Sequence, residues 1–281
     1  MWARKYIPRR GFSAPTKYSS VITEPKIRAP SRSFLYAIGL TEEDFKKPFV
    51  GISPCWVEGN PCNVSLLSLS EVIKESVTEA GLNGLRFSTI SASDAISIGT
   101  EGMRFSLLSR ELIADSVEAV SRNLYYDANI TIPNCDKNMP GVLIAHARLN
   151  RPGLIVYGGA TMTGSLKGEE VDIQRVNEIH GELLAGKITE KQFDDITRCA
   201  VPCSGSCPGM FTASTMSIAI EALGMCLPGS SSTPNVHPNK QIEARQAGPA
   251  IRNLLEKNIR TGHRDNQRWQ HIGDIQHHPA G

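Results

Sequence analysis

The chain has 281 residues, of which 40% are hydrophobic and 21% are charged, and its formal net charge is +2. This is the ordinary composition of a globular protein, so low-complexity and collagen-like chains are excluded. No apolar run reaches the roughly 18 residues that a bilayer-spanning helix needs, so we expect no transmembrane segment and no membrane partner.

The positive charge is concentrated near the N-terminus. Residues 1–40 contain eight Lys or Arg and one acid, a net charge of +7, which leaves a net charge of −5 for residues 41–281. Because no basic stripe remains in that larger part, we expect no nucleic-acid partner. Residues 1–23 contain no acid, several hydroxyl side chains and no continuous apolar core, which is typical of a mitochondrial transit peptide. The alternative is a disordered basic tail; we assign residues 1–29 to this leader and predict the mitochondrial matrix as the location.

Hydrophobic periodicity predicts helices that alternate with short strands. Helices are expected over 64–80, 109–125, 140–149 and 240–257. Two more are expected, one from the Thr189–Gln192 capping box to Arg198 and one that follows the 203–209 loop and runs through Met216 to Leu223. Strands are expected over 87–90, 128–132 and 154–157, and loops over 91–102 and 203–209. This alternation favours an α/β fold with a mainly parallel sheet flanked by helices.

Seven cysteines indicate reduced thiols. An odd number and a non-secretory N-terminus argue against disulfides, and the absence of a C-x-x-C pair argues against a zinc ribbon. Cys62, Cys135 and Cys207 each stand in a polar loop before a predicted helix, where the helix dipole favours a thiolate. Asp94 lies in a Ser/Gly loop from which it can reach the crevice beyond the strand ends. From spacing alone, each cysteine is either a small buried residue or a metal ligand.

Several longer strings carry a resemblance. In chain order they are Pro-Ser-Arg at 30–32, LYAIGL at 35–40, GNPCN at 59–63, SDAIS at 93–97, GTEGMR at 99–104, SRELIADS at 109–116, NCDK at 134–137 and GSCPGMFT at 205–212. With these strings, residues 30–260 resemble the dihydroxy-acid dehydratase family, which also includes phosphogluconate and sugar-acid dehydratases. The GNPCN string is most similar to the branched-chain amino-acid branch.

The resemblance implies a metal site and a reaction. It implies an iron–sulfur cluster, [2Fe–2S] or else [4Fe–4S], bound by Cys62, Cys135 and Cys207 with one iron position open. It also implies Mg²⁺ bound by Asp94, Asp136 and Lys137, the lysine being carbamylated so that it offers oxygen ligands. The implied reaction is dehydration of a 2,3-dihydroxy carboxylic acid to a 2-oxo acid in valine and isoleucine biosynthesis. A sugar acid is the alternative substrate, and a homodimer is the implied state of full-length members.

The resemblance also implies a domain organisation. Residues 30–260 correspond to the cluster- and Mg-binding N-terminal domain, and members are considerably longer than this chain. Their second domain supplies a serine base and a further Mg²⁺ ligand, so no catalytic base is assigned here. Residues 261–281 depart from the family pattern and are expected to form a disordered tail, although His277 and His278 could instead bind a metal.

Two interpretations follow from the length of the chain and from its divergent C-terminal residues. The chain is either the first half of a dehydratase or an inactive product that still binds a cluster. An unrelated zinc protein is the third reading. Four cysteines match no ligand position and are expected to be structural: Cys55, Cys199, Cys203 and Cys226.

Overall fold

A four-stranded parallel sheet forms the centre of the protein. The computed structural model describes residues 16–262. The sheet has the strand order β2-β1-β3-β4. The strands are β1 (Phe49–Pro54), β2 (Asn83–Arg86), β3 (Ala128–Ile132) and β4 (Gly153–Ile155). The predicted α/β class with a mainly parallel sheet is therefore confirmed.

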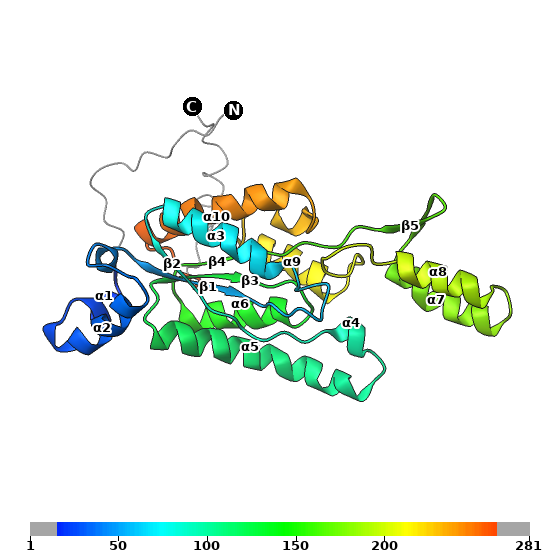
Figure 1. Ribbon diagram of the computed structural model, residues 1–281, viewed down its shortest axis with the longest axis horizontal. Helices are drawn as coiled ribbons and strands as arrows, with labels where there is room; N and C mark the ends of the chain where they lie inside the picture. The colour runs from blue at the N-terminus through cyan, green and yellow to red at the C-terminus, as the bar shows by residue number, and fades with distance from the viewer. Residues whose placement is uncertain (1–15, 263–281) are drawn as a thin grey trace, which may run out of the picture.

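Two pairs of long helices cover the two faces of the sheet (Figure 1). One pair is α3 (Leu66–Glu79) and α10 (Pro238–Glu256), and the other is α5 (Arg104–Asn123) and α6 (Asn138–Leu149). Each pair packs closely because a glycine lies at its contact. A Cβ on Gly248 of α10 would stand 2.2 Å from the carbonyl oxygen of Ser76 in α3. A Cβ on Gly141 of α6 would stand 2.9 Å from the carbonyl oxygen of Arg110 in α5.

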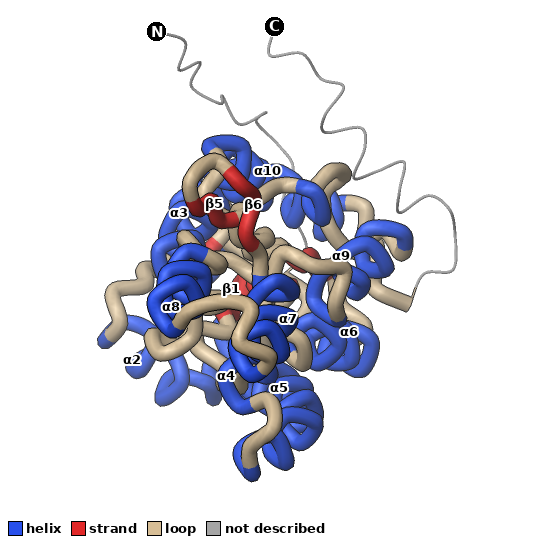
Figure 2. Tube along the Cα trace, turned by 90° about the vertical axis from the view of Figure 1, so that its right-hand side faces the viewer, coloured by secondary structure: helices blue, strands red, loops and turns tan. Residues whose placement is uncertain are grey.

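The remaining elements lie at the two ends of the sheet. They are α1 (Ser20–Thr23), α2 (Ala29–Ala37), α4 (Asp94–Ser97), the antiparallel pair β5 (Gly164–Leu166) and β6 (Glu169–Val171), α7 (Ile173–Leu184), α8 (Glu190–Cys199) and α9 (Thr212–Ala222). Helices α1 and α2 lie at the end where the strands begin, whereas α4, α7 and α8 lie beyond the opposite end, which faces the viewer in Figure 2. Within residues 16–262, no helix is both long and apolar enough to cross a membrane.

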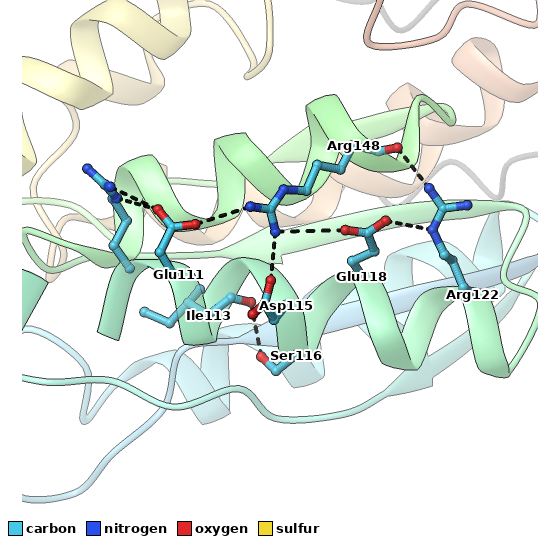
Figure 3. Close-up of polar contacts among 8 residues, drawn as sticks. Glu111, Ile113, Asp115, Ser116, Glu118, Arg122 and Arg148 are labelled. Atoms are coloured by element: carbon cyan, nitrogen blue, oxygen red, sulfur yellow. Dashed lines mark hydrogen bonds and ion pairs between the residues drawn. The ribbon is translucent and has the colours of Figure 1, made fainter. Parts of the chain in front are cut away.

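An ion-pair ladder joins α5 and α6 along their solvent side. Figure 3 shows Arg148 of α6 between three carboxylates of α5, with its guanidinium 2.7 Å from Asp115, 3.1 Å from Glu111 and 3.9 Å from Glu118. Because water reaches these side chains and screens their charges, the pairs add little to stability. The ladder therefore aligns two helices that hydrophobic contacts already hold together.

The amino end of the sheet is organised by the buried carboxylate of Asp127. Its Oδ1 accepts hydrogen bonds from the backbone N–H groups of Tyr18 (2.7 Å) and Ser19 (3.1 Å), and its Oδ2 accepts one from Phe49 (2.9 Å). The guanidinium of Arg151 lies over the Tyr18 ring, 3.9 Å from its centroid. Packed structure thus begins upstream of residue 30, where the sequence placed the start of the domain.

One strand prediction was displaced and one strand was missed, and strand pairing explains both differences. The strand expected over 87–90 lies at 83–86, because β2 is an edge strand imposed by pairing with β1 even though its first residues, Asn and Gly, are poor strand formers. Backbone pairing continues past it, since Phe87 and Thr89 donate to the carbonyls of Ile52 and Pro54. Strand β1 itself was not predicted, because a glycine and a proline interrupt its apolar run.

The helix predictions were closer to the structure. The stripe predicted over 64–80 forms α3, the Thr189–Gln192 capping box opens α8, and the strand over 128–132 is β3 without any shift. The segment 91–102, predicted to be a loop, contains the short helix α4, whose first turn is capped by the Ser93 side chain. Helix α7 and the β5–β6 pair were not predicted.

Candidate metal centre

The candidate site lies at the carboxyl ends of β1 and β3, the two central strands. The chain leaves β1 through α3 on one face and leaves β3 through α6 on the other, so a crevice opens between the two loops. The loop after β1 carries Cys62 and the loop after β3 carries Cys135. Cys207 joins them through a parallel bridge between Ala160, which follows β4, and Ser206.

The three thiols meet in this crevice. The Cys62 thiol hydrogen-bonds to the side chains of both Cys135 and Cys207. Cys62 and Cys135 are 3% exposed, and Cys207 is half-buried. The structure therefore brings together three residues that are about 70 positions apart in the sequence.

Contact between the thiols shifts their pKa values in opposite directions. The pKa of Cys62 is raised, first by its hydrogen bonds to Cys135 and Cys207 and then by burial. The pKa of Cys135 is lowered, mainly by the bond from Cys62 and also by one from the Asn60 side chain. The pKa of Cys207 is likewise lowered by the bond from Cys62. Cysteine binds metals as the thiolate, so the lowered pKa values of Cys135 and Cys207 are compatible with metal binding.

Buried asparagines surround the thiols. Asn60 donates to Asn63 (2.7 Å) and to Cys135 Sγ (3.5 Å). Asn63 in turn donates to the carboxamide oxygen of Asn138 (2.7 Å), which also accepts from the backbone N–H of Cys135 (3.2 Å). Asn134 donates to the carbonyl oxygen of Cys62 at 2.7 Å. The two cysteine loops are therefore tied together by side-chain amides.

Two atoms of this amide network lack partners. Asn134 Oδ1 and Asn138 Nδ2 are buried and make no hydrogen bond within the described part of the chain. Leaving such a group unsatisfied costs about 1–3 kcal/mol, so buried polar atoms normally have a partner, which can be water or a bound group. Unsatisfied amides beside three thiols therefore fit a polar cofactor in the crevice.

A group of charged residues adjoins the thiols. Asp94, at the start of α4, accepts from Lys137 Nζ at 2.6 Å and from Ser106 Oγ of α5 at 2.7 Å. Asp136 hydrogen-bonds to Asp94 and to the backbone of Ala213 at the start of α9. Burial, and then the charge of Asp94, raise the pKa of Asp136. The Lys137 ammonium, which pairs with Asp94, offsets part of this repulsion, because its charge lowers the pKa of Asp136.

The donor atoms decide which metals fit. Within residues 16–262, no group of three or more His, Cys, Asp or Glu side chains is placed so that it could hold a single metal ion, whereas a structural zinc site needs four such ligands. Three cysteine side chains that meet in one crevice instead fit an iron–sulfur cluster, which they would hold with one position left open. Asp94 and Asp136 offer the oxygen ligands that Mg²⁺ requires.

A small pocket opens beside the thiols. Its lining includes Asn60, Cys62 and Cys207, together with Ile96 of α4 and Ile173 of α7. A larger cavity of about 310 Å³ lies at the opposite end of the sheet, between Tyr18, Asp127 and Leu255. That cavity is lined by none of the predicted site residues.

The other cysteines lie outside the thiol group. Cys55 and Cys226 are buried, and burial is the main cause that raises the pKa of each. Cys203 Sγ accepts from the backbone N–H of Met162 at 3.4 Å, and Cys199 ends α8. His277 and His278 lie outside the described residues.

Sequence reasoning missed the residues that support the ligands. Asn60, Asn63 and Asn134 were quoted only as letters within the GNPCN and NCDK strings, and Asn138 and Ser106 were not singled out. The available signal was the repeated placement of Asn next to the candidate cysteines. Whether such an Asn is buried or simply forms a turn depends on the tertiary structure.

Comparison with known proteins adds relatives for most of the chain. Residues 47–267 match the sequence model of the dihydroxy-acid/6-phosphogluconate dehydratase N-terminal family. A mitochondrial dihydroxy-acid dehydratase of Aspergillus fumigatus is 52% identical over 251 residues, which are 88% of this chain and 41% of the relative. A mitochondrial enzyme of that name from Schizosaccharomyces pombe is 52% identical over 247 residues (87% and 41%). A chloroplastic one from Arabidopsis thaliana is 50% identical over 244 residues (87% and 40%). The chain spans about two fifths of the length of these relatives.

Proposed function

Because this chain belongs to the dihydroxy-acid/6-phosphogluconate dehydratase family, we propose that it is the cluster- and metal-binding part of a dihydroxy-acid dehydratase. Such an enzyme is a hydro-lyase that converts a small 2,3-dihydroxy carboxylic acid into a 2-oxo acid. The substrate loses the proton on C2 and the hydroxyl on C3 as water, and the resulting enol tautomerises to the ketone.

The observation that carries the proposal is the meeting of three cysteine thiols at the carboxyl edge of the sheet. Cys62, Cys135 and Cys207 would hold the iron–sulfur cluster, and Asp94, Asp136 and a carbamylated Lys137 would hold Mg²⁺. When bound, these groups would supply Lewis acids for the departing hydroxyl and for the substrate carboxylate. Hydroxide is a poor leaving group, so this division of work suits the reaction.

The chain's own residues prepare the site for this chemistry. Ser106 fixes one oxygen of Asp94, which leaves the other oxygen directed at Lys137. The backbone of Ala213 fixes Asp136 beside them. Preorganised ligands of this kind lower the cost of binding a hard cation, because little rearrangement is needed.

Large apolar side chains stand exposed around the same end of the sheet. Ile96, Ile98, Phe105 and Met210 are each at least 60% exposed. Apolar surface that is gathered in one place is typical of an interaction site. We propose that further polypeptide of the full enzyme covers it, and that this polypeptide completes the substrate pocket.

We further propose a mitochondrial matrix location. The strong positive charge of residues 1–40 and the mitochondrial names of the two fungal relatives support it. Since Tyr18 and Ser19 are bonded to Asp127, a removable leader would end before Tyr18. A fluorescent protein fused to residues 1–17 should enter mitochondria, and a cytosolic signal from that fusion would contradict the proposal.

The test of the function uses the purified 281-residue chain, reconstituted with iron and sulfide without oxygen. We expect a visible absorption band and bound iron, both of which Cys207→Ser should remove. Turnover of 2,3-dihydroxyisovalerate that depends on Cys207 would establish an active enzyme. Cluster binding without turnover would identify the inactive form. Bound zinc without iron would overturn the proposal.

A further inference from the structure

The amides beside the thiols are each held in one orientation. A backbone N–H can only donate and a backbone carbonyl can only accept, so backbone contacts distinguish the two ends of an amide side chain. Asn63 Nδ2 donates to the carbonyl oxygen of Cys55 at 2.6 Å. Asn60 Oδ1 accepts from the backbone N–H of Cys62 at 3.2 Å. Both side chains are therefore oriented by the backbone.

The contact between these two side chains agrees with those orientations. Asn60 Nδ2 donates to Asn63 Oδ1 at 2.7 Å, and turning either amide over would place like atoms against each other. The nitrogen of Asn60 also lies 3.5 Å from Cys135 Sγ. Because the nitrogen cannot exchange places with the oxygen, Asn60 presents a donor to this sulfur.

The sulfur is held as firmly as the donor. Asn60 and Cys135 are each 3% exposed. The backbone N–H of Cys135 donates to Asn138 Oδ1, which also accepts from Asn63. Donor and acceptor thus belong to a single buried network.

We propose that Asn60 tunes the cluster through an N–H···S hydrogen bond to Cys135. This inference rests on the proposed cluster site and adds a residue that binds no metal. Hydrogen bonds to ligand sulfurs are among the factors that set the reduction potential of an iron–sulfur cluster.

The direction of the effect follows from charge. A hydrogen bond to a thiolate draws electron density away from sulfur, so it stabilises the reduced, more negative cluster more than the oxidised one. Asn60 therefore raises the reduction potential. It also leaves the iron poorer in electrons, which makes the iron a stronger Lewis acid. Asn60 acts through Cys135 and is a positioning residue.

The test compares the reconstituted 281-residue chain with its Asn60→Leu variant, which keeps the side-chain size and removes the donor. We expect the reduction potential, measured by titration with redox dyes, to shift to more negative values. Ser91→Ala is the matched control, because Ser91 Oγ donates to Asn138 Oδ1 at 3.2 Å in the same network. Its removal deletes a hydrogen bond that involves no sulfur, so the potential should stay unchanged.

A second measurement needs no substitution. In the chain labelled with ¹⁵N-asparagine, electron–nuclear double resonance of the reduced cluster should detect a coupled nitrogen. The absence of that coupling would overturn the inference, as would equal potentials in the original chain and Asn60→Leu, or an equal shift in Ser91→Ala. Those results would leave the proposed cluster site intact. If the original chain binds no iron, the cluster site and this inference fail together.

Discussion

The two ends of the central sheet differ in how their buried carboxylates are held, although buried polar atoms without a partner among residues 16–262 occur at both ends, such as Asn129 Oδ1 near the start of β3. At the amino end, the carboxylate of Asp127 accepts three backbone hydrogen bonds, and both of its oxygens have partners. At the carboxyl end, Asn134 Oδ1 and Asn138 Nδ2 find no partner within residues 16–262. The carboxylates of Asp94 and Asp136 also crowd each other at this end.

This difference separates stability from binding. A satisfied buried carboxylate stabilises the fold, because it joins the N-terminal segment to two strands. Crowded acids such as Asp94 and Asp136 lower stability, and such groups persist in proteins mainly where they serve a function. Substitutions at the carboxyl end should therefore affect cofactor binding, whereas substitutions at the amino end should affect unfolding.

The largest expected effect is at the thiols. Cys62→Ser removes the thiol that contacts both of the others, so the reconstituted chain should lose its iron and its visible absorption band. Circular dichroism should show the fold retained.

Cys55→Ser is the matched control for that change. Cys55 is buried in the same loop but lies outside the thiol group, so iron binding should persist. Equal loss of iron in both variants would show that the loop, and not the ligand, was damaged.

The next effect concerns the loop that brings Cys207 to the site. Gly205 has a φ of 138°, and a Cβ there would stand 2.2 Å from the backbone nitrogen of Thr161. Gly205→Ala should destabilise the chain by about 3 kcal/mol through strain and overlap. Iron content should also fall, because the bridge between Ala160 and Ser206 must open.

Gly99→Ala is the control that distinguishes backbone strain from steric overlap. Gly99 also has a positive φ, but the space around its Cβ position is open. Its expected cost is about 1 kcal/mol with iron binding kept. An equal loss of iron in the two variants would contradict the role assigned to the Gly205 bridge.

A smaller effect is expected at the amino end. Asp127→Ala leaves three backbone donors without their acceptor, and we expect a loss of about 2–3 kcal/mol in the free energy of unfolding. Burial raises the pKa of Asp127, which means that its charge is partly disfavoured and offsets some of the gain. Urea denaturation measures the change, with the exposed Asp115→Ala as control. If Asp127→Ala abolished iron binding, the separation of the two ends would be wrong.

The smallest expected effect is the pH dependence of the stability that Asp44, just before β1, contributes. Hydrogen bonds from Lys47 and Thr41 lower its pKa from 3.8 to about 2. The contribution of Asp44 to stability is therefore present above pH 3.8 and is lost as the pH falls toward 2. Since the pair lies beside solvent, the contribution should stay below about 1 kcal/mol. The difference in unfolding free energy between the original chain and Asp44→Asn should shrink from pH 5 to pH 2, and a constant difference would contradict this assignment.

The sequence predicted the layers of the fold better than its strands. Helix α3 has four apolar residues at helical spacing, and that local pattern survives in the structure. Strand β1 has no comparable pattern, because its six buried residues include Gly51 and Pro54. Its place at the centre of the sheet depends on pairing with β2 and β3, and such contacts between distant segments leave little trace in local spacing.

The candidate site was predicted through resemblance and not through spacing. Cys62, Cys135 and Cys207 are too far apart in sequence to suggest a shared site, and only the strand order brings their loops together. The orientation of Asn60 toward Cys135 was beyond sequence reasoning, because it depends on hydrogen bonds within the loop after β1 and on the position of the loop after β3.

The wide spacing of the three thiols has a consequence for the lifetime of the protein. A group bonded to all three would act as a cross-link that closes two loops of about 70 residues each. In the chain-entropy account, closing one such loop removes freedom from the unfolded chain worth about 4 kcal/mol. The cofactor would then stabilise the fold as well as take part in the reaction. Oxidative loss of the cofactor would shorten the survival of the chain together with its activity.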